Sequence, residues 1–213
     1  MIRLHKGPIP ESLGKNGAKW KAELMERVEQ GAEIPDSMWN RYNQPDVKQQ
    51  IVTDAYSKCA YCESKIAHVT FGDIDHLRPK KRFPTTTYEW SNLLLACPRC
   101  NNKKRDNYNE VVPPVNPVTE DPAAFLIAYG DQIWPQPGQD RGAETIALVE
   151  LNRPELIERR RRRCEQIRHV AEAIVRMTGE AAKAALIEQL RQELGDDHEY
   201  AFVSRAAAQA LGL

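Results

Sequence analysis

Hydrophobic residues recur at helical spacing in the first quarter of the chain. The pattern predicts two helices, the first over about 17–30 and the second beginning near Asp46, a residue type that caps helix N-termini. Gly31 marks the end of the first helix. The apolar positions are Trp20, Leu24 and Val28 in the first helix and Val47, Ile51 and Ala55 in the second. Residues 1–16, which are rich in proline and glycine, are expected to form an arm.

The middle of the chain shows the patterns of two short strands and a helix. Residues 72–77 alternate polar and apolar side chains, and residues 93–96 form a continuous apolar run. We predict that these two segments pair as antiparallel strands. The polar run that begins at Asn101 is expected to start a helix, whose first amide groups would face an anion.

The last third of the chain is predicted to be mostly helical. Prolines dominate residues 112–122, which should form an extended linker, and a small hairpin is expected around Gly130. From about residue 142 the apolar spacing is helical, with one helix capped by Asn152 and Glu155.

These patterns together predict an α+β fold that is mostly α-helical. It comprises an N-terminal arm and helices (1–58), a small ββα core (59–111), the proline-rich linker and hairpin (112–141) and a C-terminal helical bundle (142–213). The 213 residues are 41% hydrophobic and 28% charged, which is typical of a soluble globular protein. The first residues lack the apolar core of a signal peptide, and no apolar run approaches membrane length, so we expect a cytoplasmic protein with no membrane partner.

Five cysteines are the most informative residues. Two Cys-x-x-Cys pairs, Cys59/Cys62 and Cys97/Cys100, bracket the predicted strands, and two such turns complete the four-sulfur shell that binds zinc. A redox pair and buried apolar thiols are the alternatives. A filled shell leaves no position for water, so this zinc would be structural. Cys164 lies on the apolar side of a predicted helix and is expected to be a free core thiol.

With its cysteine pairs, an Asp-His pair between them and an Asn-Asn-Lys-Lys run after them, the stretch 59–104 resembles HNH nucleases of the ββα-metal type with a four-cysteine zinc. The resemblance implies that His76 is the general base and that Asp75 and Asn101 bind a catalytic divalent cation. It also implies that Asn92 orients the base and that Lys104 contacts phosphate. Two oxygen ligands with waters suit Mg²⁺ or Mn²⁺.

The chemistry of phosphodiester hydrolysis agrees with this resemblance. The reaction needs a base for water, a cation for the developing charge and positioned positive groups. Residues 58–105 contain ten Lys and Arg against four acids, although the whole chain, with 30 of each, is neutral. This local excess favours a phosphate-backbone ligand, and Arg78 and Lys80 are candidate substrate contacts. A solvated loop is the alternative for 80–82, and a zinc ligand or a core histidine is the alternative for His76.

The chain has a Lys-Gly-Pro-x-Pro arm at 6–10, a Cys-Ala-Tyr-Cys turn at 59–62 and an Asp-His-x-x-Pro-Lys strand at 75–80. With these motifs, residues 1–160 are also similar in pattern to one subgroup, the HNH subunit of Septu-type antiphage systems and of some retron operons. That subunit works beside an ATPase, so the resemblance implies an ATPase partner and antiphage defence. DNA is favoured over RNA as the nucleic acid, although no residue here reads bases. Two other classes stay open: a catalytically silent zinc-knuckle module that only binds nucleic acid, and an interaction subunit that cleaves only in complex with its ATPase.

Five consecutive arginines, 159–163, form the most unusual feature of the C-terminal region. Because five positions go fully round a helix, Arg160 or Arg161 must lie on its apolar side and needs a buried partner. For the other arginines there are three interpretations: they pair with local acids such as Glu155 and Glu158, they bind nucleic acid, or they bind an acidic protein partner. The sequence leaves these three interpretations open.

Overall fold

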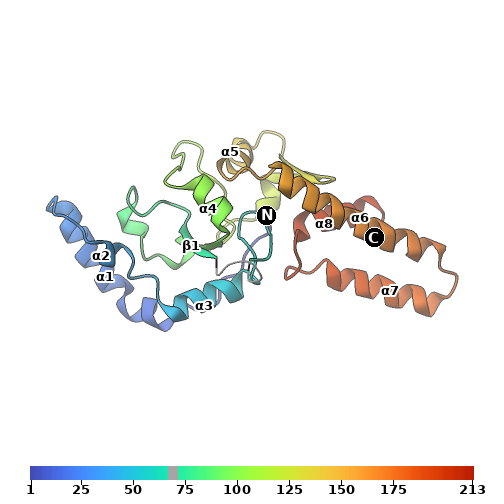
Figure 1. The fold of residues 1–213 in the computed structure, drawn as a ribbon, viewed down its shortest axis with the longest axis horizontal. Coiled ribbons are helices and arrows are strands. Elements are labelled where there is room, and N and C mark those ends of the chain that lie inside the picture. Colours follow the sequence, from blue (N-terminus) through green and yellow to red (C-terminus); the bar gives the residue numbers. More distant parts are fainter. Residues whose placement is uncertain (67–71) are drawn as a thin grey trace.

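The computed structural model describes residues 1–66 and 72–213, so His68, the histidine that the sequence places in the loop before the Asp-His pair, lies outside the described residues. Figure 1 shows the N-terminal helices at one end of the molecule, the C-terminal helices at the other, and the small β-hairpin between them. The helices are α1 (Glu11–Glu29), α2 (Asp36–Trp39), α3 (Pro45–Asp54), α4 (Pro98–Lys104), α5 (Asp140–Leu148), α6 (Pro154–Arg176), α7 (Glu180–Glu193) and α8 (Ala201–Ala210). The strands are β1 (Asp73–His76), β2 (Leu93–Ala96), β3 (Leu126–Tyr129) and β4 (Gln132–Pro135).

The predicted strand, strand and helix order in the middle of the chain is confirmed. β1 pairs with β2 in antiparallel register, with Asp75 opposite Leu94 and His76 opposite Leu93. Every residue of β2 is buried, which explains why its sequence is a continuous apolar run rather than an alternating one. α4 begins at Pro98, earlier than predicted, because proline is well suited to the first position of a helix.

The N-terminal arm is shorter than predicted. α1 begins at Glu11, directly after Pro10, and an acidic residue in the first turn favours a helix start there. Asp46 does not cap α3, which begins at Pro45. The Asp46 carboxylate instead accepts hydrogen bonds from the backbone and hydroxyl of Ser12, at 2.8 and 2.6 Å, and so ties the start of α1 to α3. Gly31, with a φ of +61°, follows the end of α1 as predicted.

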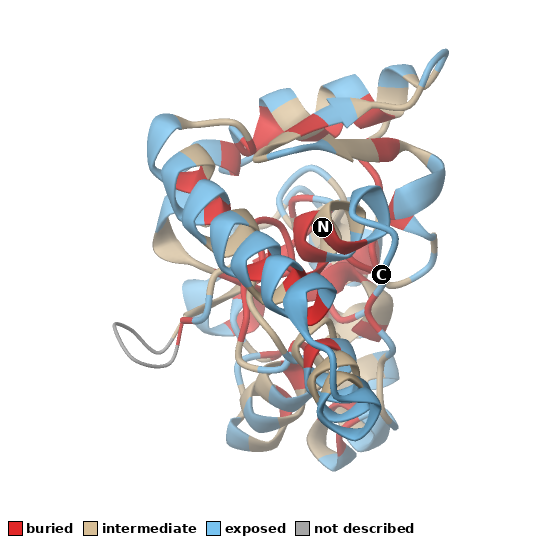
Figure 2. Cartoon of the chain, turned by 90° about the vertical axis from the view of Figure 1, so that its right-hand side faces the viewer, coloured by how far each residue is buried: buried red, intermediate tan, exposed pale blue. Residues whose placement is uncertain are grey.

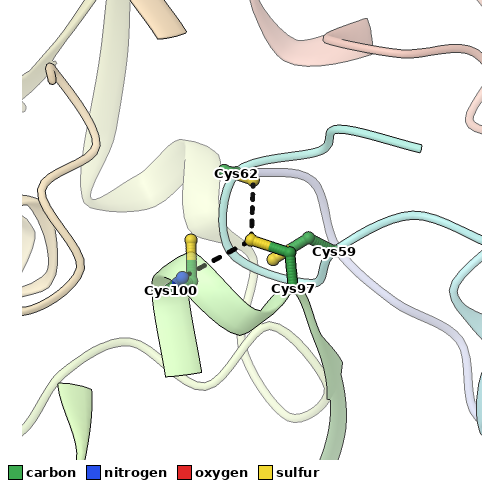
Figure 3. A group of neighbouring side chains, drawn as sticks. All are labelled: Cys59, Cys62, Cys97 and Cys100. Carbon is green, nitrogen blue, oxygen red and sulfur yellow. Dashed lines mark hydrogen bonds between the residues drawn. The ribbon is translucent and has the colours of Figure 1, made fainter. Parts of the chain in front are cut away.

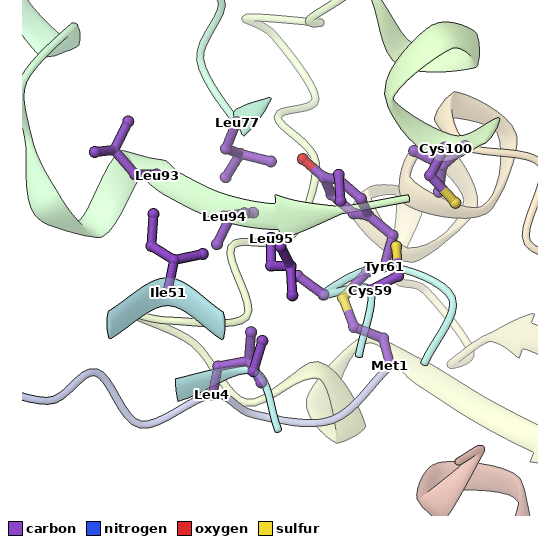
Figure 4. Close-up of a cluster of buried hydrophobic side chains, with 14 of the residues drawn as sticks. Met1, Leu4, Ile51, Cys59, Tyr61, Leu77, Leu93, Leu94, Leu95 and Cys100 are labelled. Carbon is purple, nitrogen blue, oxygen red and sulfur yellow. The ribbon is translucent and has the colours of Figure 1, made fainter. Parts of the chain in front are cut away.

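The main hydrophobic core of the described residues extends along most of the chain, apart from a smaller, separate cluster formed by Ile167, Ile174, Leu190 and Ala208. The main core runs from Met1 and Leu24 through the hairpin to Val203, and the buried sides of the helices face it (Figure 2). Figure 4 shows its centre, where Leu4 and Ile51 lie near the side chains of β2. The residues of this core come from all four predicted segments. The division into four segments therefore stays a prediction about chain organisation.

The C-terminal region contains the predicted hairpin and helices, with different caps. β3 and β4 pair across Gly130, which has a positive φ. Asn152 does not cap α6, which begins at Pro154. Its side-chain amide instead pairs with both backbone groups of Ile133 on β4, with hydrogen bonds of 2.9 and 2.6 Å. None of the helices in the described ranges is long and apolar enough to cross a lipid bilayer.

The structure confirms the prediction that one arginine of the run 159–163 is buried. Arg160 is 1% exposed, and its guanidinium donates to the carbonyl of Leu151 at 2.7 Å. The next three arginines make ion pairs on the surface: Arg161 with Asp131, Arg162 with Glu158, and Arg163 with Glu193. Of the two acids expected to pair with the run, Glu158 does so, whereas Glu155 pairs with Arg99. Binding of nucleic acid or of an acidic partner by the run stays a prediction.

Candidate metal and catalytic site

The four paired cysteines converge on one point. Their sulfur atoms all lie within 4.8 Å of one another, and the Sγ atoms of Cys62 and Cys97 are 3.9 Å apart (Figure 3). Four sulfurs at about 2.3 Å from a tetrahedral zinc would be about 3.8 Å apart. The cluster therefore fits zinc, as predicted. Burial raises the pKa of the Cys59 thiol, so a cation at the centre is needed to hold it as a thiolate.

Two local structures deliver these cysteines. Cys59 and Cys62 lie in the turn that follows α3, and Cys97 caps α4, where its sulfur accepts the backbone N–H of Cys100 at 3.4 Å. The start of this helix thus has a backbone N–H group that faces a cysteine sulfur, which would be an anionic thiolate with zinc bound. Arg153 donates to the sulfur of Cys100 at 3.6 Å and offsets part of the negative charge that a four-thiolate zinc carries. Nothing in the sequence singled out Arg153.

His76, at the end of β1, is buried and held in one orientation. Its Nε2 lies 2.8 Å from the carbonyl oxygen of Thr87, so that nitrogen carries the proton and donates. The ring of Tyr42 packs edge-on against the imidazole, with 4.5 Å between the ring centroids. Nδ1 therefore keeps its lone pair, and no side chain in the described part of the protein donates a hydrogen bond to it. Burial lowers the pKa of His76 to about 3.

The low pKa of His76 predicts a measurable loss of stability in mild acid. The unfolded chain takes up a proton on His76 below about pH 6.5, whereas the folded protein does not until about pH 3. The free energy of unfolding should therefore fall, by about 1.4 kcal/mol per pH unit below pH 6.5, relative to a His76→Ala variant. Denaturant melts of both proteins between pH 7.5 and 5.5 check this, a window in which zinc-bound thiolates stay deprotonated. Parallel pH dependences of the two proteins would contradict it.

Asp75 is buried beside His76, with a partner on each carboxylate oxygen. The Tyr61 hydroxyl donates to Oδ2 at 2.5 Å, and the Lys104 ammonium lies 3.2 Å from Oδ1. Burial raises the pKa of Asp75, and these two partners oppose that effect.

Lys104 differs most from what the sequence suggested. Its side chain is 0% exposed, and besides Asp75 its ammonium donates to the carbonyl of His76 at 2.6 Å. In this arrangement Lys104 stabilises the Asp75 carboxylate from within the core. Direct contact with phosphate would require the side chain to move, and it stays a prediction.

Asn101, the other expected cation ligand, bonds to a carboxylate that the sequence analysis did not select. Its side-chain N–H group donates to Asp73 at 3.0 Å, and its amide oxygen accepts no hydrogen bond from the described residues. Because side chains two apart on a strand point to the same side, Asp73 could have been predicted to lie with Asp75. Besides Nε2 of His76, the hydrogen-bond donors that orient side chains in this site belong to Tyr61, Lys104 and Asn101.

Asn92 braces the loop that holds His76 and makes no direct contact with the His76 ring. Its side chain accepts the backbone N–H of Arg78 at 2.8 Å and donates to the carbonyls of Arg78 and Thr86, both at 3.1 Å. Thr86 precedes Thr87, whose carbonyl binds the His76 ring. Asn92 therefore acts on His76 through this loop, and no signal in the sequence pointed to Thr87.

The two expected substrate contacts lie beyond the end of β1. The guanidinium of Arg78 is exposed and donates to the Tyr108 hydroxyl at 3.2 Å. Lys80 is partly buried and donates to the side-chain oxygen of Asn40 at 2.7 Å. Arg78 is thus the more accessible of the two.

Comparisons with known proteins agree with the geometry. Residues 59–107 match the family model for HNH endonucleases. The chain is 27% identical over 154 residues to a Septu protein PtuB from Bacillus thuringiensis, covering 71% of this chain and 55% of that protein. It is 30% identical over 150 residues to a Septu protein PtuB from Bacillus mycoides (strain KBAB4), covering 56% of this chain and 51% of that protein. The chain thus spans about half the length of these curated relatives.

Proposed function

We propose that residues 59–107, an HNH endonuclease domain, make this chain a metal-dependent endonuclease that hydrolyses phosphodiester bonds of nucleic acid. The observation that carries the proposal is the state of His76. One ring nitrogen is fixed by the Thr87 carbonyl, and the other is an unprotonated acceptor at the end of the hairpin. A histidine held neutral in this way is ready to take a proton from an attacking water at cellular pH.

The residues beside His76 fit a hard divalent cation. Asp75 and Asn101 both offer side-chain oxygens, and a carboxylate oxygen that accepts one hydrogen bond keeps a further lone pair. Mg²⁺ or Mn²⁺ bound there would stabilise negative charge on the phosphoryl and leaving oxygens. His76 would remove the proton from water, Asn92 would hold the loop that aligns His76, and Lys104 would keep Asp75 ionised.

We further propose that DNA is the substrate and that the protein works in antiphage defence with an ATPase subunit. The similarity to Septu proteins over about 150 residues supports the defence role. The basic excess of residues 58–105, with the exposed Arg78 near the hairpin, supports a nucleic-acid ligand. Incubating the purified chain with plasmid DNA and with RNA, each with Mg²⁺ or EDTA, tests the reaction and its substrate. Absence of Mg²⁺-dependent cleavage, alone and with the subunit encoded beside it, would contradict the proposal.

The cation ligands give a prediction that separates catalysis from folding. Asn101→Ala and Asp75→Asn should fold with zinc bound but need a higher Mg²⁺ or Mn²⁺ concentration for half-maximal cleavage, by roughly 10-fold or more. Asparagine is preferred to alanine at Asp75, because its amide oxygen can still accept a hydrogen bond from the buried Lys104 ammonium, whereas alanine offers no acceptor. Cleavage measured across a Mn²⁺ series checks this. A half-maximal concentration equal to that of the parent would exclude the two residues as ligands.

A silent zinc module that only binds nucleic acid is the second candidate. Its basis is the four-sulfur cluster, which by itself is a structural site. The two candidates differ in one readout, since the silent module would bind DNA but would never nick it.

A further inference from the structure

We infer that Tyr61, in the turn that carries the first two zinc ligands, is a positioning residue that orients Asp75 for the catalytic cation. The inference rests on the proposed function, which makes Asp75 a ligand of that cation. Tyr61 lies between Cys59 and Cys62 in the sequence, and only 1% of it is exposed. Figure 4 shows it between the cysteines and the side chains of β2.

The contact that carries the inference is a short hydrogen bond. The Tyr61 hydroxyl donates to Oδ2 of Asp75 at 2.5 Å, inside the core, and both residues are buried. Hydrogen bonds to an ionised acceptor in a water-poor environment are stronger than those between neutral groups. Because the phenol ring is fixed by its packing, the bond also fixes the rotation of the carboxylate about its last side-chain torsion.

The second contact to Asp75 comes from the other zinc-binding element. Lys104, which lies 3.2 Å from Oδ1, is the last residue of α4, and α4 starts at the cysteine pair Cys97/Cys100. Each cysteine pair therefore delivers one hydrogen-bond donor to one oxygen of Asp75. The zinc centre sets the distance between these two donors, and through them it sets the orientation of the carboxylate.

This arrangement has a defined consequence for cation binding. Residues that orient a metal ligand contribute about 10- to 100-fold in metal affinity or activity when they are removed. Without the phenol, the carboxylate would be free to rotate about its contact with Lys104 and would meet the cation in fewer productive orientations. Tyr61 does not touch substrate or cation in this account, so it acts through Asp75.

The experiment compares Tyr61→Phe with a matched control. Tyr88→Phe also removes one buried tyrosine hydroxyl, whose hydrogen bond to the carbonyl of Met38 has the same 2.5 Å length. Both variants should keep a full complement of zinc, and Tyr61→Phe should lose more stability than Tyr88→Phe, because the Tyr61 hydroxyl donates to an ionised acceptor. Mn²⁺ affinity of the zinc-loaded proteins, measured by electron paramagnetic resonance without nucleic acid, should fall about 10-fold or more in Tyr61→Phe and stay at the parent value in Tyr88→Phe.

Each other outcome decides against the inference. Unchanged Mn²⁺ affinity in Tyr61→Phe, with affinity lost in Asp75→Asn, would overturn the role of Tyr61 and leave the proposed function intact. Loss of zinc in Tyr61→Phe would make Tyr61 a structural residue of the zinc turn. Unchanged affinity in Asp75→Asn as well would remove Asp75 from the cation site and overturn both proposals.

Discussion

Replacing Cys59 or Cys97 by serine should unfold the hairpin and α4 and release the zinc. A structural zinc contributes on the order of 10 kcal/mol in small metal-nucleated folds, which is comparable to the whole stability of a typical domain. Cys59 belongs to the main hydrophobic core, which contains residues from Met1 to Val203, so the effect of its loss should spread beyond the zinc turn. Zinc content and a thermal melt of each variant measure the effect.

Cys164 provides the control for this experiment. Its sulfur is not part of the four-cysteine cluster and contacts the carbonyl of Gly130 instead. Cys164→Ser should keep the zinc and melt within a few degrees of the parent, since it removes a weak, partly exposed contact. If Cys59→Ser and Cys97→Ser were as stable as Cys164→Ser, the structural role of the cluster would be refuted.

Replacing His76 by alanine should abolish cleavage while leaving the zinc in place. A general base contributes roughly 100- to 10,000-fold to the rate, and in this site no other described side chain offers an unprotonated imidazole nitrogen at the end of β1. Initial cleavage rates with excess Mg²⁺, compared with parent protein at equal zinc content, measure the loss. His169→Ala is the control, because that histidine is exposed on α6, far along the chain from the hairpin. Near-parent rates in His76→Ala would exclude it as the base.

The fold of the middle segment was predictable because each of its sequence patterns lies within a few consecutive residues. The spacing of the cysteines and the short apolar run of β2 were enough to expect two strands and a helix. The structure confirms all three elements, as β1, β2 and α4. The contacts that tune the site were not predictable in the same way. Thr87 reaches His76 through a backbone carbonyl, and any residue type can supply a carbonyl, so no sequence pattern marks it.

The two helix caps that were predicted wrongly, at Asp46 and Asn152, failed for the same physical reason. Asp46 and Asn152 are good capping residues by type, but tertiary contacts compete for the same side-chain oxygens. Ser12 takes the carboxylate of Asp46, and the backbone of Ile133 takes the amide of Asn152. Prolines at positions 45 and 154 then begin the helices. A capping pattern in one segment of sequence gives no information about a distant residue that forms a hydrogen bond with the same side chain.

The connection between β1 and β2 has a consequence for how related chains can vary in length. Loops that join strands usually tolerate inserted residues, because each doubling of loop length costs only about 0.6 kcal/mol. In this loop the carbonyl of Thr87 holds the His76 ring, and Asn92 bonds to the backbone at both Arg78 and Thr86. An insertion between Arg78 and Asn92 would thus displace the carbonyl that holds the His76 ring even if the protein still folded. Functional relatives should keep the length of this loop fixed and accommodate insertions in segments that make no contact with the hairpin.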